Sequence, residues 1–178
     1  MRIVSGELKG RRFSPPRNFK ARPTTDFAKE NIFNVLNNII DFEDVAVLDL
    51  FSGTGSISYE FASRGATDII AIENNYKHFK YISKTVQKLN LEDQIIVFKS
   101  CAFRYIKKTT ASFDIVFADP PYDMKEAETL PEKVLKSGIL KPDGMFIFEH
   151  SDKKEYSHTP RFSEVRKYGK VNFSIFRV

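Results

Sequence analysis

Two short stretches of this chain carry side chains that could hold a ligand and direct its chemistry. Asp49–Gly55 reads Asp-Leu-Phe-Ser-Gly-Thr-Gly, and Asp119–Tyr122 reads Asp-Pro-Pro-Tyr. They end two apolar runs, Val45–Leu50 and Phe113–Ala118, whose composition is typical of buried parallel strands. Ligands of open α/β sheets bind at the carboxyl ends of the strands. We therefore predict that the two stretches form a cofactor cradle and an amine-binding loop on one sheet.

The first stretch could bind a ligand with its backbone. Gly53 and Gly55 have no Cβ, so their N–H groups can approach a ligand closely. Ser58 occupies the place of the third glycine of a dinucleotide fingerprint, which disfavours a dehydrogenase. Glu73 ends the next predicted strand and could accept both ribose hydroxyls, or it could simply face water. Asp49 lies in an apolar strand, so we expect loop N–H groups or a cationic ligand to pair with it.

The second stretch could activate an amine for attack on a methyl group. The lone pair of a base or amide nitrogen is delocalised, and hydrogen-bond acceptors for its N–H groups localise it. The Asp119 carboxylate and the Pro120 carbonyl could be those acceptors, and Tyr122 could stack on the base. Pro120 and Pro121 cannot continue a helix or a strand ladder, so they would hold the loop rigid. The alternative is a purely structural loop with a capping Asp119 and a packed Tyr122.

The positive charge of the chain lies at its beginning. Residues 1–25 carry seven basic residues and one acidic residue, a net charge of +6, whereas all 178 residues together carry +5. A basic segment on a nearly neutral body is expected to contact phosphates. A solvated tail is the alternative. Apolar residues and glycines interleave with the cations, which favours a structured, hairpin-like basic arm over residues 1–25.

Helices and strands alternate after this arm, which predicts a Rossmann-like, mostly parallel sheet of seven strands with helices on both faces. The final hairpin would add an antiparallel edge. The first helix is expected to have its N-cap at Thr24, Thr25 or Asp26 and to run to about Ile40. The other expected elements are helices at 56–63, 75–89, 102–108 and 126–136, strands at 45–50, 69–73, 94–99, 113–118 and 145–149, a turn at 140–144, and a hairpin of 163–168 with 172–178.

Composition limits the class of protein. We expect one domain over residues 1–178, located in the cytoplasm, because Cys101 is the single cysteine and no apolar run approaches the ~20 residues of a membrane span. The three histidines have no metal-ligand spacing, so no metal is expected.

The chain resembles the RsmD-type 16S rRNA guanine-N2 methyltransferases, a family of class I S-adenosylmethionine-dependent enzymes, over nearly its full length. The Asp49–Gly55 turn is shared by many methyltransferases and indicates only this class of enzyme. The Arg22-Pro-Thr-Thr-Asp26 segment is what indicates this particular family. The matching residues are Met1–Gly6, Gly10–Arg12, Arg22–Asp26, Glu30, Phe33, Asn34, Asp49–Gly55, Ser63–Ala66 and Asp119–Tyr122.

The resemblance implies a role for each matching position. S-adenosyl-L-methionine would be held by Asp49, Phe51, Ser52, Gly53, Thr54, Gly55, Glu73, Asn74, Cys101, Ala102 and Asp119. From its residue type alone, Phe51 is expected to pack rather than to contact the ligand. The catalytic loop would be Asp119, Pro120, Pro121 and Tyr122. The residues implied to contact 16S rRNA, within an assembling small ribosomal subunit, are Arg2, Arg11, Arg12, Arg22, Thr24 and Thr25.

Two positions depart from the family pattern. Cys101-Ala102 replaces an Asp or Asn before Ala at the adenine site, and cysteine is a weak acceptor. Lys29 stands where arginine is common, and lysine cannot grip a phosphate with two parallel hydrogen bonds. The alternatives to an rRNA enzyme are a DNA adenine-N6 or protein glutamine methyltransferase, which use a similar loop, and a non-enzymatic RNA-binding module.

Overall fold

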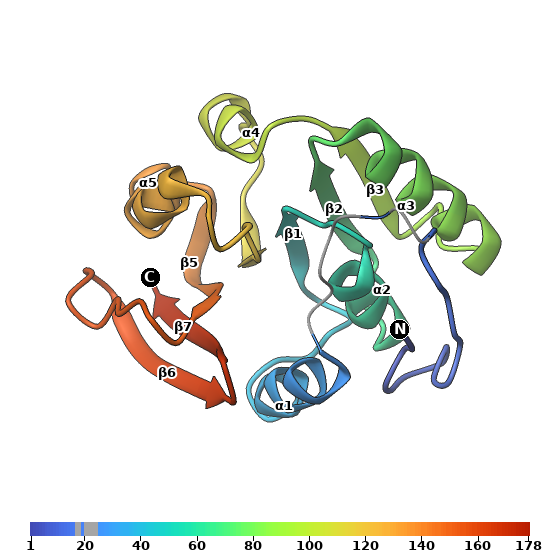
Figure 1. The fold of residues 1–178 in the computed structure, drawn as a ribbon, viewed down its shortest axis with the longest axis horizontal. Helices are drawn as coiled ribbons and strands as arrows, with labels where there is room; N and C mark the ends of the chain where they lie inside the picture. The colour runs from blue at the N-terminus through green and yellow to red at the C-terminus, as the bar shows by residue number, and fades with distance from the viewer. Residues whose placement is uncertain (17–18, 20–24) are drawn as a thin grey trace.

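In the computed structural model, which describes residues 1–16, 19 and 25–178, seven strands form one sheet in the order β3-β2-β1-β4-β5-β7-β6 (Figure 1). Neighbouring strands from β3 to β5 are parallel, and β7 is antiparallel to both β5 and β6. The predicted parallel sheet with an antiparallel C-terminal hairpin is therefore confirmed. The strands are β1 (Ala46–Leu50), β2 (Asp68–Glu73), β3 (Ile95–Lys99), β4 (Phe113–Ala118), β5 (Leu140–Ser151), β6 (Phe162–Tyr168) and β7 (Val171–Arg177).

Helices cover both faces of the sheet (Figure 1). On one face α1 (Asp26–Leu36), α2 (Ser56–Ser63) and α3 (Tyr76–Leu89) share an apolar core with Val47 of β1. On the other face α4 (Ala102–Lys108) and α5 (Leu130–Lys136) pack with Leu48 and Leu50. Successive side chains of a strand point to opposite faces, and helices cover both faces here. Every residue of β1 is therefore buried, and all of them except Asp49 are apolar. Within the described ranges no helix is long and apolar enough to cross a membrane.

The first helix is shorter than predicted. Its start agrees with the prediction of an N-cap at Thr24, Thr25 or Asp26: α1 begins at Asp26 after the N-cap Thr25, whose Oγ1 accepts a hydrogen bond from the Ala28 N–H. Its end differs, because the helix was predicted to run to about Ile40. The helix ends at Leu36, and a turn follows at Asn37. Asparagine favours turns over helix interiors, and the exposed Ile39 buries too little apolar surface to extend the helix.

The region between β4 and β5 differs from prediction in two ways. The helix predicted at 126–136 is a 3₁₀-helix, η1 (Lys125–Thr129), followed by α5, because Pro131 lacks an N–H and suits only the first turn of an α-helix. The turn predicted at 140–144 is a bulge inside β5: Leu140 pairs with Phe113, and Met145 already pairs with Ile115. Both ends of this segment pair with β4, so the chain leaves the ladder and rejoins it without reversing.

The N-terminal arm folds back on itself and packs against α2. An antiparallel bridge joins Arg2 to Arg12, so the described part of the arm contains the predicted hairpin-like turn. Ile3 is fully buried in the core beneath α1 and α2. Gly6 has a φ of +82°, and a Cβ there would lie 1.7 Å from the Ser63 carbonyl oxygen. Only glycine allows the arm to approach α2 this closely.

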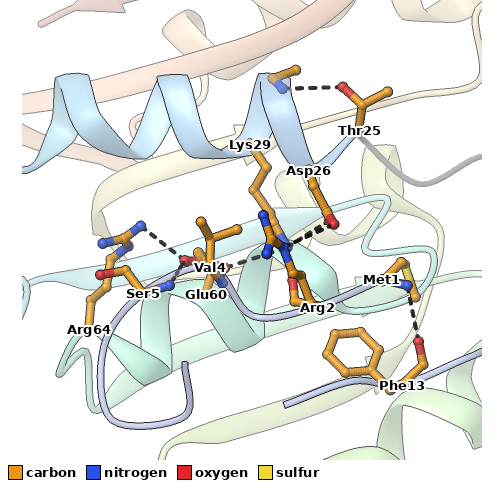
Figure 2. A network of polar contacts seen from close by, with 11 residues as sticks. Met1, Arg2, Val4, Ser5, Phe13, Thr25, Asp26, Lys29, Glu60 and Arg64 are labelled. Atoms are coloured by element: carbon orange, nitrogen blue, oxygen red, sulfur yellow. Dashed lines mark hydrogen bonds and ion pairs between the residues drawn. The ribbon is translucent and has the colours of Figure 1, made fainter. Parts of the chain in front are cut away.

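A buried carboxylate on α2 holds the arm in place (Figure 2). Glu60 is fully buried and accepts hydrogen bonds from the backbone N–H groups of Val4, at 2.9 Å, and Ser5, at 3.1 Å. Arg64 pairs with the same carboxylate at 2.9 Å, and Lys29 at 3.5 Å. Lys29 is 1% exposed, and desolvation lowers its pKa although Glu60 and Asp26 act in the opposite direction. This lysine is thus an internal ion-pair partner and does not face the phosphates of an RNA.

We predict that Glu60→Ala lowers the free energy of unfolding by about 3–5 kcal/mol, because it leaves the buried Lys29 ammonium without its main partner. Urea unfolding followed by circular dichroism measures the loss. Glu132→Ala is the matched control, because Glu132 forms an exposed ion pair with Lys136 on α5. That control should leave the free energy of unfolding almost unchanged, because solvent screens an exposed ion pair. Equal losses in the two variants would contradict the structural role of Glu60.

Candidate functional site

The turn after β1 needs glycine for a specific steric reason. Gly55 is the N-cap of α2 with a φ of +79°, and a Cβ there would lie 2.4 Å from the Tyr59 hydroxyl oxygen. Gly53 also has a positive φ, of +53°. Phe51 has a φ of +62°, which is unusual for a residue with a side chain, and its ring contacts that of Phe103 edge-on. The backbone therefore curls tightly at the carboxyl end of β1.

Asp49 points from β1 toward the first turns of α2. The alternation that sends Leu48 and Leu50 to one face sends Asp49 to the other, where the Ser58 hydroxyl donates a 2.5 Å hydrogen bond to its carboxylate. The partner that the structure shows is thus a hydroxyl on α2 and not a loop N–H, whereas the other predicted partner, a cationic ligand, stays a prediction. Ser58 is the residue that replaces the third glycine. Burial, with a smaller contribution from the charge of Glu73, raises the pKa of Asp49 to about 7 despite the hydrogen bonds from Ser58.

Glu73 links the turn after β1 to the end of β2. One carboxylate oxygen accepts a hydrogen bond from the Gly53 N–H at 2.9 Å, and the other accepts one from the Asn75 N–H at 2.6 Å. His78 of α3 lies 3.9 Å from the same carboxylate. Each carboxylate oxygen can accept a second hydrogen bond, so these contacts leave capacity for ligand hydroxyls.

The loop Asp119–Tyr122 follows β4, the strand next to β1. Pro120 is buried, whereas Tyr122 is 46% exposed. The Tyr122 hydroxyl donates a 3.2 Å hydrogen bond to Glu149 of β5, whose side chain is almost fully buried. Sequence reasoning missed Glu149, because its place at the end of an apolar run was the only signal.

A cavity of about 980 Å³ brings both sequence motifs together at the carboxyl ends of the parallel strands. It includes all the predicted site residues at 49, 51–54, 73–74, 101–102 and 119–122, together with Thr25 from the arm. Gly55 does not line it. Phe51, expected to pack, does so against the core and also lines the cavity. Further lining residues that were not predicted include Ser56, His78, Phe103, Met124, Glu126, Glu149 and Lys170.

The predicted RNA-contacting residues do not all lie at this cavity. Arg11 and Arg12 are exposed on the arm, and Arg2 is exposed and lies 3.5 Å from Asp26. Arg22 and Thr24 fall outside the residues that the structure describes. In the described part of the chain, no three His, Cys, Asp or Glu side chains are arranged to hold a metal ion.

Comparisons with known proteins identify the family. A family model described as "Conserved hypothetical protein 95" matches residues 1–177. Ribosomal RNA small subunit methyltransferase D of Escherichia coli K12 is 32% identical over 149 residues, which cover 84% of this chain and 74% of that protein. The protein of the same name from Buchnera aphidicola subsp. Acyrthosiphon pisum is 32% identical over 163 residues, covering 89% and 82%. This chain belongs to the RsmD-type methyltransferase family.

Solved structures agree with this RsmD-type fold. A hypothetical protein of Thermus thermophilus matches with a TM-score of 0.86 at 24% identity, over 100% of this chain and 99% of its own. SMU.776, whose structure is complexed with SAH, matches with a TM-score of 0.66 at 17% identity, over 84% of this chain and 49% of that one. These likenesses confirm the Rossmann-like class I methyltransferase fold.

We predict that Asp49 makes the stability of this RsmD-type protein fall as the pH rises from about 4 to about 7. The folded state raises the pKa of Asp49 from 3.8 to about 7, so in this range the folded state holds a proton that the unfolded state releases. Measured by urea unfolding without ligand, Asp49→Asn should remove this decline. Unfolding free energies of the two proteins that run parallel from pH 4 to pH 8 would contradict the assignment.

Asp114 is a control, because its contribution to stability should depend on pH in the opposite direction to that of Asp49. Partial burial acts to raise its pKa, but hydrogen bonds from Lys141 Nζ, at 2.7 Å, and the Ala46 N–H, at 2.8 Å, hold that pKa below its usual value. This carboxylate stabilises the fold above the pKa of the unfolded state and loses that effect as the pH falls. Asp114→Asn should therefore remove stability at pH 7 and little below the folded-state pKa.

Proposed function

We propose that this protein transfers a methyl group from S-adenosylmethionine to the N2 amine of a guanine in 16S rRNA, within an assembling small ribosomal subunit in the cytoplasm. One observation carries the proposal: an acidic cavity that holds the Asp119–Tyr122 loop lies in the same domain, residues 1–178, as an exposed basic arm. The family membership supports the methyltransferase class, and the names of the relatives support rRNA as the substrate.

The charge of the cavity favours a cationic ligand over a dinucleotide. Among the described residues, five carboxylates line it and one lysine, Lys170; the carboxylates are Asp49, Glu73, Asp119, Glu126 and Glu149. The pyrophosphate of a dinucleotide would be repelled by such a lining, whereas the ammonium and sulfonium groups of S-adenosylmethionine would be attracted. An ammonium placed beside Asp49 would also favour the ionised carboxylate, which counteracts the effect of burial on its pKa.

Different lining residues would hold different parts of the cofactor. Asp49 and the curled turn up to Gly55 would hold the methionine part, and Glu73 would accept hydrogen bonds from the ribose hydroxyls. Cys101 is the N-cap of α4 and makes no side-chain capping hydrogen bond. The adenine would depend on backbone groups around Ala102 and Phe103, which line the cavity, because a thiol is a weak acceptor.

The loop after β4 would prepare the amine for attack. When bound, S-adenosylmethionine supplies a methyl group on a positively charged sulfur, and that sulfur keeps the electron pair of the broken C–S bond. The Asp119 carboxylate and the Pro120 carbonyl accept the N2–H groups, which directs the nitrogen lone pair at the methyl carbon as the N–C bond forms. The surplus proton of the nitrogen passes to Asp119 or to water. Tyr122 offers an exposed ring on which an unstacked guanine can lie.

A methyl-incorporation assay tests the proposed substrate against its rivals. Small-subunit particles should receive label from the methyl-labelled cofactor, whereas naked DNA and a release-factor-like protein should not. Label in DNA adenine or in protein glutamine would support the alternative methyltransferases. No binding of S-adenosylmethionine by calorimetry, with RNA binding intact, would instead support a non-enzymatic RNA-binding module.

We predict that Asp119→Ala slows methyl transfer by about 10²- to 10³-fold in single turnover, since it removes an acceptor that acts on the attacking amine. Calorimetry should show cofactor binding within about tenfold of the native affinity, because the other lining residues remain. Asp123→Ala, an exposed aspartate just after the same loop, is the control and should transfer at the native rate. An unchanged rate in Asp119→Ala would remove Asp119 from the mechanism.

We also predict that replacing Arg11 and Arg12 together by Ala weakens RNA binding and reduces its salt dependence. The slope of log K against log salt should become shallower by about 0.7–0.9 for each phosphate that the arm no longer neutralises. Fluorescence anisotropy at several salt concentrations measures both quantities. The matched control replaces Lys107 and Lys108, two adjacent exposed lysines at the end of α4. Equal losses in both double variants would show that the arm is not the RNA site.

A further inference from the structure

Glu149 is a buried carboxylate beside the catalytic loop. Ala118 of β4 pairs with Phe148 of β5 in parallel register, so Asp119, the first residue after β4, lies beside Glu149, which is still within β5 and pairs with Phe173 of β7 on its other side. Neighbouring strands lie about 4.8 Å apart. The side chain of Glu149 is 3% exposed and nevertheless lines the cavity. Two carboxylates thus flank the place where the proposed function puts the target amine.

The contact with Tyr122 places the Glu149 carboxylate relative to the base. The Tyr122 hydroxyl donates to Oε1 of Glu149 at 3.2 Å. The hydroxyl is at the rim of the tyrosine ring. If the guanine stacks on the face of this ring, the Glu149 carboxylate therefore lies beside the edge of the base and not under its face. A carboxylate accepts up to about four hydrogen bonds, so it can take one from a base while it keeps the tyrosine contact.

The chemistry of guanine supplies donors for both carboxylates. Its Watson–Crick edge carries the N2 amine and, next to it, the N1–H donor, whereas adenine and 2-aminopurine have a lone pair at N1. Enzymes read a flipped base by hydrogen bonds to this edge. A buried carboxylate facing N1 accepts from guanine and repels a base with a lone pair there, because both partners would be acceptors.

We propose that Glu149 accepts the N1–H of the target guanine and so selects guanine, while Asp119 accepts from N2. This inference rests on the proposed function and assigns the residue that determines its base specificity. Glu149 is a specificity residue in this account: it contacts the substrate base but takes no proton from the reacting nitrogen.

The test compares guanine with 2-aminopurine, which keeps the 2-amino group but lacks the N1–H. Small-subunit particles are reconstituted with either base at the position that the enzyme methylates, and kcat/KM is measured for each with native protein and with Glu149→Gln. The glutamine keeps an oxygen for Tyr122 and offers an N–H₂ donor to the lone pair at N1. The ratio of kcat/KM for guanine over 2-aminopurine should fall by at least about tenfold in Glu149→Gln.

Partial unfolding of Glu149→Gln cannot mimic this result. Unfolding would lower kcat/KM for both bases alike, whereas the expected result is a change in their ratio. Glu92→Gln, an exposed residue between α3 and β3 at the opposite end of the strands, is the control and should keep the native ratio. Native protein that methylates guanine, together with an unchanged ratio in Glu149→Gln, would overturn the role of Glu149 and leave the proposed function standing. Native protein that methylates neither base would overturn both.

Discussion

One buried carboxylate, that of Glu60, joins the parts of the structure on which the site depends. It lies on α2, the helix that begins at the glycine turn, and it binds the backbone of the arm at Val4 and Ser5. Its ion pair with Lys29 ties in α1, whose N-cap Thr25 lines the cavity. A buried charge is tolerated only when it is fully paired, so the arm, α1 and the glycine turn after β1 are held as one unit.

Opposite charges are separated between the cavity and the arm. Carboxylates dominate the cavity lining in the described residues, whereas the described part of the arm exposes Arg2, Lys9, Arg11 and Arg12. This separation suits a protein with two ligands of opposite charge, a cationic cofactor and a polyanionic RNA. Under the proposed function, a base that enters the cavity would present hydrogen-bond donors to carboxylates, and the phosphates attached to it would stay outside. The carboxylates of Asp119, just after β4, and Glu149, within β5, would then accept hydrogen bonds from adjacent atoms of one base.

The sequence predicted the elements whose signal is local. Apolar runs marked the parallel strands, and the Asp49–Gly55 and Asp119–Tyr122 motifs marked the two sides of the cavity, because the carboxyl ends of parallel strands meet. Contacts between distant residues were not predictable. The burial of Lys29 depends on Glu60, far along the chain, and the bulge after Leu140 depends on pairing with β4 at both of its ends. A role for Glu149 could be inferred only from its hydrogen bond with Tyr122, which the structure shows.

Mass-spectrometric mapping of methylated guanines in small-subunit RNA, from cells with and without this protein, tests the central claim most directly. We expect one N2-methylguanine to disappear in the absence of the protein and to return when the native protein, but not Asp119→Ala, is supplied. An unchanged set of methylated guanines would contradict the assignment of guanine N2 in 16S rRNA as the substrate.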